Sequence, residues 1–302
     1  MNRREFIGAA AAVAVSPAMA GCATASKTCG GRILFGACQG PDKVKLLASV
    51  GYDFWECGVG TVLCPDNDAE WWKRQRDMLA AQPLPLRSCN GFIPGKFRLT
   101  GPKADFAPAL AYAETALRRA EEAGVKTVVF GSGGARNVPG DICGAKEQKP
   151  LTEQGVEQYT EFCRQLCAKV ADLRNVQIVI EPLRPNESNI INYVWQGLQI
   201  IEDVGSPRLR QLADIFHMMM GRECAESIVK AGDLLKHCHI ASYGDRKFPG
   251  SNPAEVGRLR PYFDALRKIG YAGGVSCECG WGEKGDLAKN LETALTTMKG
   301  LI

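Results

Sequence analysis

Eight short apolar segments alternate with helical patterns along almost the whole chain, and this alternation limits the fold more than any other feature. Most segments are continuously apolar and bounded by Gly or Pro, which is typical of strands buried on both faces of a parallel sheet. The segments are 32–37, 52–58, 85–91, 126–132, 176–182, 209–216, 234–241 and 273–280. Between them, apolar residues at helical spacing predict helices at 108–124, 155–173 and 286–299, and a further helix that begins at an Asn192 cap.

Eight strand–helix units in succession predict a single α/β domain, a (β/α)8 TIM barrel that spans residues 31–302. The chain of 302 residues, 45% of them hydrophobic, is large enough to build one such core. An open doubly wound sheet is the alternative arrangement of alternating strands and helices. No G-x-G-x-x-G sequence follows the first predicted strand, and this disfavours the alternative.

The beginning of the chain has the layout of an export signal, so we exclude segment 1–30 from the barrel. The arginine pair at 3–4 precedes an apolar stretch at 6–15, and small residues follow at 18–20. This layout resembles a twin-arginine signal and predicts an exported protein, either periplasmic or anchored to the membrane as a lipoprotein. Two interpretations stay open for Cys22. Either it carries a lipid anchor, or the signal is cleaved in the ordinary way after residue 20 and Cys22 has no special role.

Charge and cysteine content exclude several classes of partner and site. The net charge of +4, without a basic run, argues against nucleic acid as a partner. No apolar run is long enough for a mature transmembrane helix, so membrane contact is expected only through a lipid anchor at Cys22. The 13 cysteines lie mostly inside apolar segments and suggest no disulfide framework, so we expect buried thiols, including Cys163 and Cys167. The sequence leaves open whether the chain forms a homo-oligomer.

Four consecutive predicted strands each end in a side chain that can bind a metal ion. In a (β/α)8 barrel, catalytic side chains come from the carboxyl ends of the strands, where these residues would meet. Buried carboxylates with no cation between them would repel one another or bind protons, so the grouping predicts one divalent metal ion. Three carboxylates and one imidazole suit Mn²⁺, Mg²⁺, Co²⁺, Fe²⁺ or Zn²⁺, and the sequence does not choose among them. The predicted ligands are Glu181, Asp214, His239 and Glu278.

Other polar residues lie close to the predicted ligands. His237 precedes His239 by two residues, so strand alternation turns both toward the barrel interior, and we expect His237 to be a buried support for the ligand. Glu56 and Asn90 end the second and third predicted strands and are in reach of the same pocket. The glycine-rich segment 131–140 is either a loop whose backbone N–H groups meet an anion or a plain tight loop.

Three further residues follow the predicted ligands within a few positions and offer hydrogen-bonding groups for the hydroxyls and carbonyl of a sugar. Glu187 comes six residues after Glu181, His217 follows the aspartate in the sequence DIFHM, and Arg246 comes seven residues after His239. We therefore expect Glu187, His217 and Arg246 to contact a small-molecule carbohydrate substrate.

Four sequence blocks resemble those of the sugar phosphate isomerase/epimerase family, a xylose-isomerase-like barrel group that includes ketose 3-epimerases, inosose dehydratases and hydroxypyruvate isomerases. The blocks are IVIEPLRPNESN, DIFHM, HCHIASYGDRKFPG and SCECG, and the resemblance extends from about residue 31 to the end. It implies the same four metal ligands and the same three substrate contacts. The loop from His239 to Arg246 is one residue longer than in the ketose 3-epimerases.

Together these features predict a metal-dependent carbohydrate isomerase or epimerase that acts on a keto-sugar. We expect Glu181 and Glu278 to be catalytic and to move a proton through an enediolate. Two alternatives stay open, a keto-sugar lyase or dehydratase that uses the same site and a non-catalytic exported sugar-binding protein. A metal-dependent abasic-site endonuclease is disfavoured, because the chain has only three histidines and no basic surface run.

Overall fold

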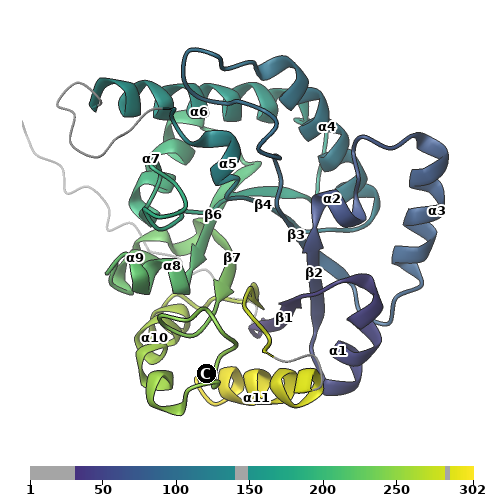
Figure 1. The fold of residues 1–302 in the computed structure, drawn as a ribbon, viewed down its shortest axis with the longest axis vertical. Coiled ribbons are helices and arrows are strands. Elements are labelled where there is room, and N and C mark those ends of the chain that lie inside the picture. The colour runs from purple at the N-terminus through teal and green to yellow at the C-terminus, as the bar shows by residue number, and fades with distance from the viewer. Residues whose placement is uncertain (1–30, 140–148, 283–285) are drawn as a thin grey trace, which may run out of the picture.

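The computed structural model describes residues 31–139, 149–282 and 286–302. Eight parallel strands pair in sequence order and close into a barrel, in which β1 pairs with both β2 and β8. Helices surround the strands (Figure 1). The predicted (β/α)8 barrel is therefore confirmed.

The strands are β1 (Leu34–Cys38), β2 (Phe54–Gly58), β3 (Leu86–Asn90), β4 (Thr127–Phe130), β5 (Gln177–Ile180), β6 (Leu209–Asp214), β7 (Leu235–Ile240) and β8 (Gly274–Cys277). The α-helices are α1 (Val44–Val50), α2 (Val59–Val62), α3 (Ala69–Ala80), α4 (Phe106–Glu122), α5 (Gly133–Arg136), α6 (Lys149–Lys169), α7 (Val194–Val204), α8 (Ile215–Met220), α9 (Glu226–Ala231), α10 (Arg260–Lys268) and α11 (Leu287–Lys299). Short 3-10 helices lie at Pro41–Lys43, Gly232–Leu234 and Pro253–Arg258.

The predicted helices are present, with one error in how a helix begins. The side chain of Asp105 accepts a hydrogen bond from the Ala107 backbone and starts α4, which ends just before Gly124 at a φ of +76°. Asn192 does not cap α7, which begins two residues later. Its amide nitrogen instead donates to the carbonyls of Leu183 and Ser188, at 2.6 and 2.7 Å. The prediction of an Asn192 cap was therefore wrong, because the side chain forms hydrogen bonds within the preceding loop and does not reach the start of the helix.

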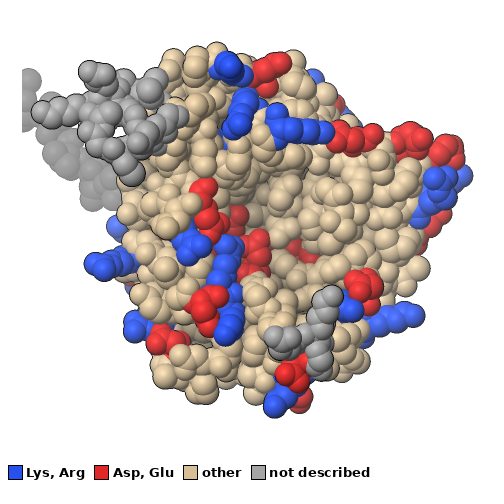
Figure 2. Space-filling view, viewed as in Figure 1, with Lys and Arg blue, Asp and Glu red and all other residues tan. Residues whose placement is uncertain are grey.

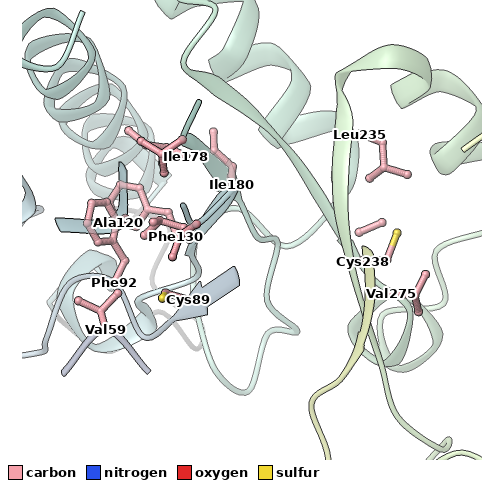
Figure 3. Packing of buried hydrophobic residues seen from close by; sticks show 14 of the residues in the cluster. Val59, Cys89, Phe92, Ala120, Phe130, Ile178, Ile180, Leu235, Cys238 and Val275 are labelled. Carbon is pink, nitrogen blue, oxygen red and sulfur yellow. The ribbon is translucent and has the colours of Figure 1, made fainter. Parts of the chain in front are cut away.

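Outward-facing strand residues pack against the helices and form the main core. Figure 3 shows Phe130 and Ile178 beside Ala120 of α4, while Cys238 lies with Val275 on another part of the barrel. The expected buried thiols are present, since Cys89, Cys163, Cys167, Cys238 and Cys277 are all buried, and every cysteine in the described part of the chain is free.

A smaller group of side chains fills the inside of the barrel. Val129, Val179 and Leu212 form their own buried cluster, on the strand faces that alternate toward the barrel axis. The ring of Phe54 also lies inside, so close to Gly36 that a Cβ there would be 2.2 Å from it. These apolar groups close the barrel beneath the carboxyl ends of the strands, where the polar side chains gather.

The predicted export signal, including Cys22, lies outside the described residues, so export and lipidation stay predictions. Within the described ranges, no helix has both the length and the hydrophobicity needed to cross a bilayer.

Candidate metal and substrate site

The four predicted metal ligands lie together at the carboxyl end of the barrel. Glu181 and Glu278 directly follow β5 and β8, Asp214 ends β6, and His239 lies in β7. One ligand atom from each residue lies within 4.8 Å of the others. Glu181, Asp214 and His239 are buried and Glu278 is half-buried. Figure 2 shows the central hollow inside the ring of strands, with acidic side chains toward its floor.

His239 lies among three carboxylates. Its Nδ1 is 2.8 Å from Oε1 of Glu181 and 3.7 Å from Oε2 of Glu278, while its Nε2 is 2.9 Å from Oε1 of Glu56. A neutral imidazole has one N–H donor and one acceptor. Burial lowers the pKa of His239, but the charges of Glu56, Glu278 and Glu181 raise it well above its usual range, so beside these carboxylates the ring carries a proton on each nitrogen. A bound divalent ion would replace the Nδ1 proton and leave the Nε2 proton donated to Glu56. Histidines that bind metals are held in this way by an outer carboxylate.

Glu56 in β2 is completely buried and also accepts a hydrogen bond from Nε2 of His237, at 2.8 Å. Burial raises the pKa of Glu56, but the neighbouring His239 and His237 lower it further, so its pKa is below the usual range. The two histidines of the sequence HCH therefore share one carboxylate. His237 is a buried support, as predicted: it shares the Glu56 carboxylate with His239, and the two rings lie edge to face with their centres 5.1 Å apart.

The charges of the site fit a bound cation. Burial raises the pKa of Glu181, and the nearby carboxylates of Glu278 and Asp214 raise it further, although His239 opposes them. Three carboxylates at this spacing repel one another unless a proton or a metal ion lies between them. A divalent ion would remove the repulsion and use the Nδ1 lone pair, so the four residues fit a metal centre with oxygen and nitrogen ligands.

Arg246 and Asn90 hold the carboxylate of Glu278. Asn90 donates to Oε1 at 2.9 Å and Arg246 donates to Oε2 at 2.6 Å. Arg246 also donates to Oε1 of Glu187 at 3.0 Å, and Arg184 donates to the same oxygen at 2.8 Å. The structure thus brings the predicted residues Glu187 and Arg246 to the cluster of candidate metal ligands despite the longer loop. Sequence reasoning missed Arg184, although it lies in the EPLRPNES block.

His217 has an unusual environment at the edge of the cluster. Its side chain is 2% exposed, and neither ring nitrogen makes a hydrogen bond with any residue that the structure describes. Nε2 lies 3.4 Å from Oδ2 of Asp214 and 3.8 Å from Oε2 of Glu187. Because a buried polar group without a partner is destabilising, this ring suits a ligand that brings its own hydroxyl group.

Arg136 holds the chain segment that carries Glu181 in place, a role that was not predicted from the sequence. Its guanidinium group is completely buried and donates to the carbonyls of Glu181 and Ile191, at 3.0 and 3.1 Å. It also donates to Oγ of Ser188 at 3.2 Å and to the carbonyl of Phe130 at 3.3 Å. One cation therefore ties the end of β4 to both ends of the segment from Glu181 to Ile191.

Gly131 and Gly133 make room for the site. A Cβ on Gly131 would lie 2.2 Å from Oε2 of Glu181, and a Cβ on Gly133 would lie 2.5 Å from the carbonyl oxygen of Glu187. A side chain at Gly131 would therefore force the Glu181 carboxylate to move, and one at Gly133 would press against backbone, which shifts less easily. Close packing against the site therefore accounts for Gly131 and Gly133, a reason that neither interpretation of this segment included.

Comparison with known proteins identifies the family. The family model described as xylose isomerase-like TIM barrel matches residues 44–300. The chain belongs to this family. The curated probable ketose 3-epimerase of Synechocystis sp. is 28% identical over 194 residues, which cover 64% of this chain and 63% of that protein. D-psicose 3-epimerase of Agrobacterium fabrum is 32% identical over 116 residues, or 36% of this chain and 38% of that protein.

The match to both curated relatives is partial, because the chain spans less than two thirds of the length of either one. A solved D-psicose 3-epimerase with D-tagatose, from Clostridium cellulolyticum H10, has the same fold with a TM-score of 0.72. The two chains are 19% identical, and the match covers 89% of this chain and 99% of that one.

Glu56→Gln is expected to weaken metal binding by about 10- to 100-fold, the usual effect of losing the carboxylate behind a metal-binding histidine. The glutamine amide can accept from only one of the two histidines, and its NH₂ group would face the other N–H. Titration of metal into chelator-treated protein measures the change.

Glu223→Gln is the matched control, because Glu223 is another buried carboxylate, 8% exposed, that accepts from the backbone N–H of Val194 at 3.0 Å. We expect it to cost stability but to leave metal affinity unchanged. Equal metal affinity in Glu56→Gln and Glu223→Gln would contradict the role assigned to Glu56.

Proposed function

We propose that this chain is a divalent-metal-dependent epimerase that acts on a keto-sugar. The observation that carries the proposal is the pair of glutamates, Glu181 and Glu278, that reach one metal-ligand cluster from different strands, β5 and β8. The partial similarity to proteins named ketose 3-epimerases supports an epimerase over other reactions of the same barrel.

Epimerisation next to a carbonyl requires one group that removes a proton and another that returns a proton to the opposite face. Glu181 and Glu278 suit these two tasks because they approach from separate strands. Asn90 and Arg246 occupy both oxygens of Glu278 and so fix its direction. When bound, the divalent ion would make the proton on the reacting carbon more acidic and stabilise the negative charge of the enediolate.

The remaining polar residues suit the binding of a polyhydroxylated substrate. The unpartnered ring of buried His217 is positioned to bind a sugar hydroxyl, and Glu187 offers an acceptor oxygen 3.8 Å from Nε2 of the same ring. Arg246 has its guanidinium carbon 5.0 Å from the ring centre of Phe216, which limits its movement. We propose that it binds the oxygen at the end of the sugar. The lyase and sugar-binding alternatives gain no support from the comparisons.

Solvent deuterium exchange tests the proposal. Metal-loaded protein in D₂O, incubated with a panel of free ketoses and keto-glycosides, is expected to place deuterium on the carbon next to the carbonyl of one of them. NMR should show the label in the starting sugar and in its epimer, and chelation of the metal should abolish both signals. Exchange accompanied by loss of water would favour a dehydratase. No exchange with any member of the panel would contradict the epimerase and favour a sugar-binding protein.

A further inference from the structure

A second cavity, of about 400 Å³, lies at the amino ends of the strands, at the opposite end of the barrel from the metal-ligand cluster. Residues at or before the starts of β3, β4, β5, β7 and β8 line it. None of the lining residues belongs to the metal and substrate site. The apolar interior cluster of Val129, Val179 and Leu212 lies on the same strands, between the two ends.

Positive charge is concentrated in this cavity. Arg87, Lys126 and Lys236 line it, and Asp233 is the one acidic residue among the lining residues. Three positive charges and one negative charge leave a formal excess of two. None of the three cations makes an ion pair or a side-chain hydrogen bond within residues 31–139, 149–282 and 286–302. By contrast, Arg118 on the outer surface is paired with both Glu114 and Asp172.

A buried hydroxyl group in the same cavity also lacks a partner. Thr127 begins β4 and is 4% exposed, and its Oγ1 makes no hydrogen bond with any residue in the described part of the chain. A threonine hydroxyl can donate one hydrogen bond and accept others. Because buried polar groups normally have partners, this hydroxyl and the unpaired cations together indicate a ligand that accepts hydrogen bonds and carries negative charge.

We propose that this cavity binds a small oxyanion, supplied either as free inorganic phosphate or as the phosphate group of a small sugar. A guanidinium group can donate two parallel hydrogen bonds to a phosphate, and the two lysines add point charges from β7 and from the residue before β4. The hydroxyl of Thr127 donates to a remaining oxygen. The volume of the cavity is also sufficient for a ligand larger than a single phosphate group. This proposal does not depend on the epimerase activity.

Calorimetric titration tests the proposal on the full chain at constant ionic strength, with inorganic phosphate, glucose 6-phosphate and glucose as separate probes. Each titration is done on metal-loaded and on chelator-treated protein, so that phosphate bound to the metal centre is recognised. We expect saturable binding of phosphate or of glucose 6-phosphate that survives chelation, and no binding of glucose. Similar affinities for inorganic phosphate and glucose 6-phosphate would show that the anion alone accounts for binding. Tighter binding of glucose 6-phosphate would show that the site recognises a phosphosugar.

Variants decide where the anion binds. Arg87→Met and Lys236→Met are each expected to weaken binding of the anion by at least tenfold. Lys45→Met removes the same charge from α1, outside the cavity, and should leave the affinity for the anion unchanged. Thr127→Val keeps the shape of the side chain and removes only the hydroxyl, so it reports on the site if a charge variant fails to fold. No saturable binding of either phosphate, or equal affinity in wild type, Lys236→Met and Thr127→Val, would overturn the proposal.

Discussion

Glu278→Gln is expected to slow epimerisation by about 10²- to 10⁴-fold, even in protein saturated with metal, because an amide cannot take up or return the proton. The glutamine oxygen can still accept from Arg246, and the Asn90 amide can turn so that its own oxygen accepts from the glutamine NH₂ group, which keeps both neighbours hydrogen-bonded. The loss should therefore appear in kcat. Steady-state rates in both directions, on the sugar found by deuterium exchange, measure it.

Asp214→Asn separates proton transfer from metal binding, because Asp214 is a ligand to which we assign no proton transfer. The activity of the Asp214→Asn variant should recover as the metal concentration is raised, whereas the activity of the Glu278→Gln variant should not. Deuterium exchange adds a second control, because Glu278→Gln should still exchange the epimer whose proton faces Glu181. A rate within tenfold of wild type for metal-saturated Glu278→Gln, or equal loss of exchange from both epimers, would show that Glu278 is not one of two bases.

The barrel could be predicted because its strands are buried on both faces and so are continuously apolar, which separates them clearly from the amphipathic helices. The strand ends were less exact. Glu181 and Glu278 lie one residue beyond β5 and β8, yet their backbone N–H groups still donate to the carbonyls of Phe130 and Ile240 in the neighbouring strands. The ladder thus continues far enough to direct both side chains into the barrel mouth, where they lie with Asp214 and His239 in the cluster of candidate ligands.

Contacts across the barrel could not be predicted in the same way. Glu56 in β2 meets His237 and His239 in β7, and the sequence indicated only that it could reach the pocket. Which residues face each other across a closed barrel depends on the stagger of all eight strands, and short apolar segments do not fix that stagger. Arg136 was missed for a related reason, since its acceptors are backbone carbonyls, which leave no trace in the sequence.

The glycine-rich segment after β4 shows a third kind of limit. From sequence, its glycines fit either an anion-binding loop or a plain tight turn, because both need backbone freedom. The structure gives a reason that involves neither. Gly131 does not have a positive φ, and its missing side chain leaves the space that the carboxylate of Glu181 occupies. A requirement of this kind depends on the neighbouring strand, and it becomes visible only when β4 and β5 are placed side by side.

Gly131→Ala is therefore expected to reduce kcat/KM by about 100-fold, the typical cost of moving a catalytic group by about 1 Å. The new Cβ would lie 2.2 Å from Oε2 of Glu181, so the carboxylate must move away from its place. Oε1 of the same carboxylate is held 2.8 Å from Nδ1 of His239, and the movement should disturb that contact and weaken metal binding as well. Kinetics on the ketose substrate and titration with metal measure the two effects.

Gly134→Ala provides the matched control three residues away in the same segment. A Cβ there would have ordinary contacts, the nearest at 3.4 Å to the backbone of Gly95, so rate and metal affinity should stay close to those of wild type. Since alanine also favours the helical conformation of α5, any change in stability should be small. If Gly131→Ala matched Gly134→Ala in both measurements, Glu181 would have room to move without loss, and its present position could not be the catalytic one.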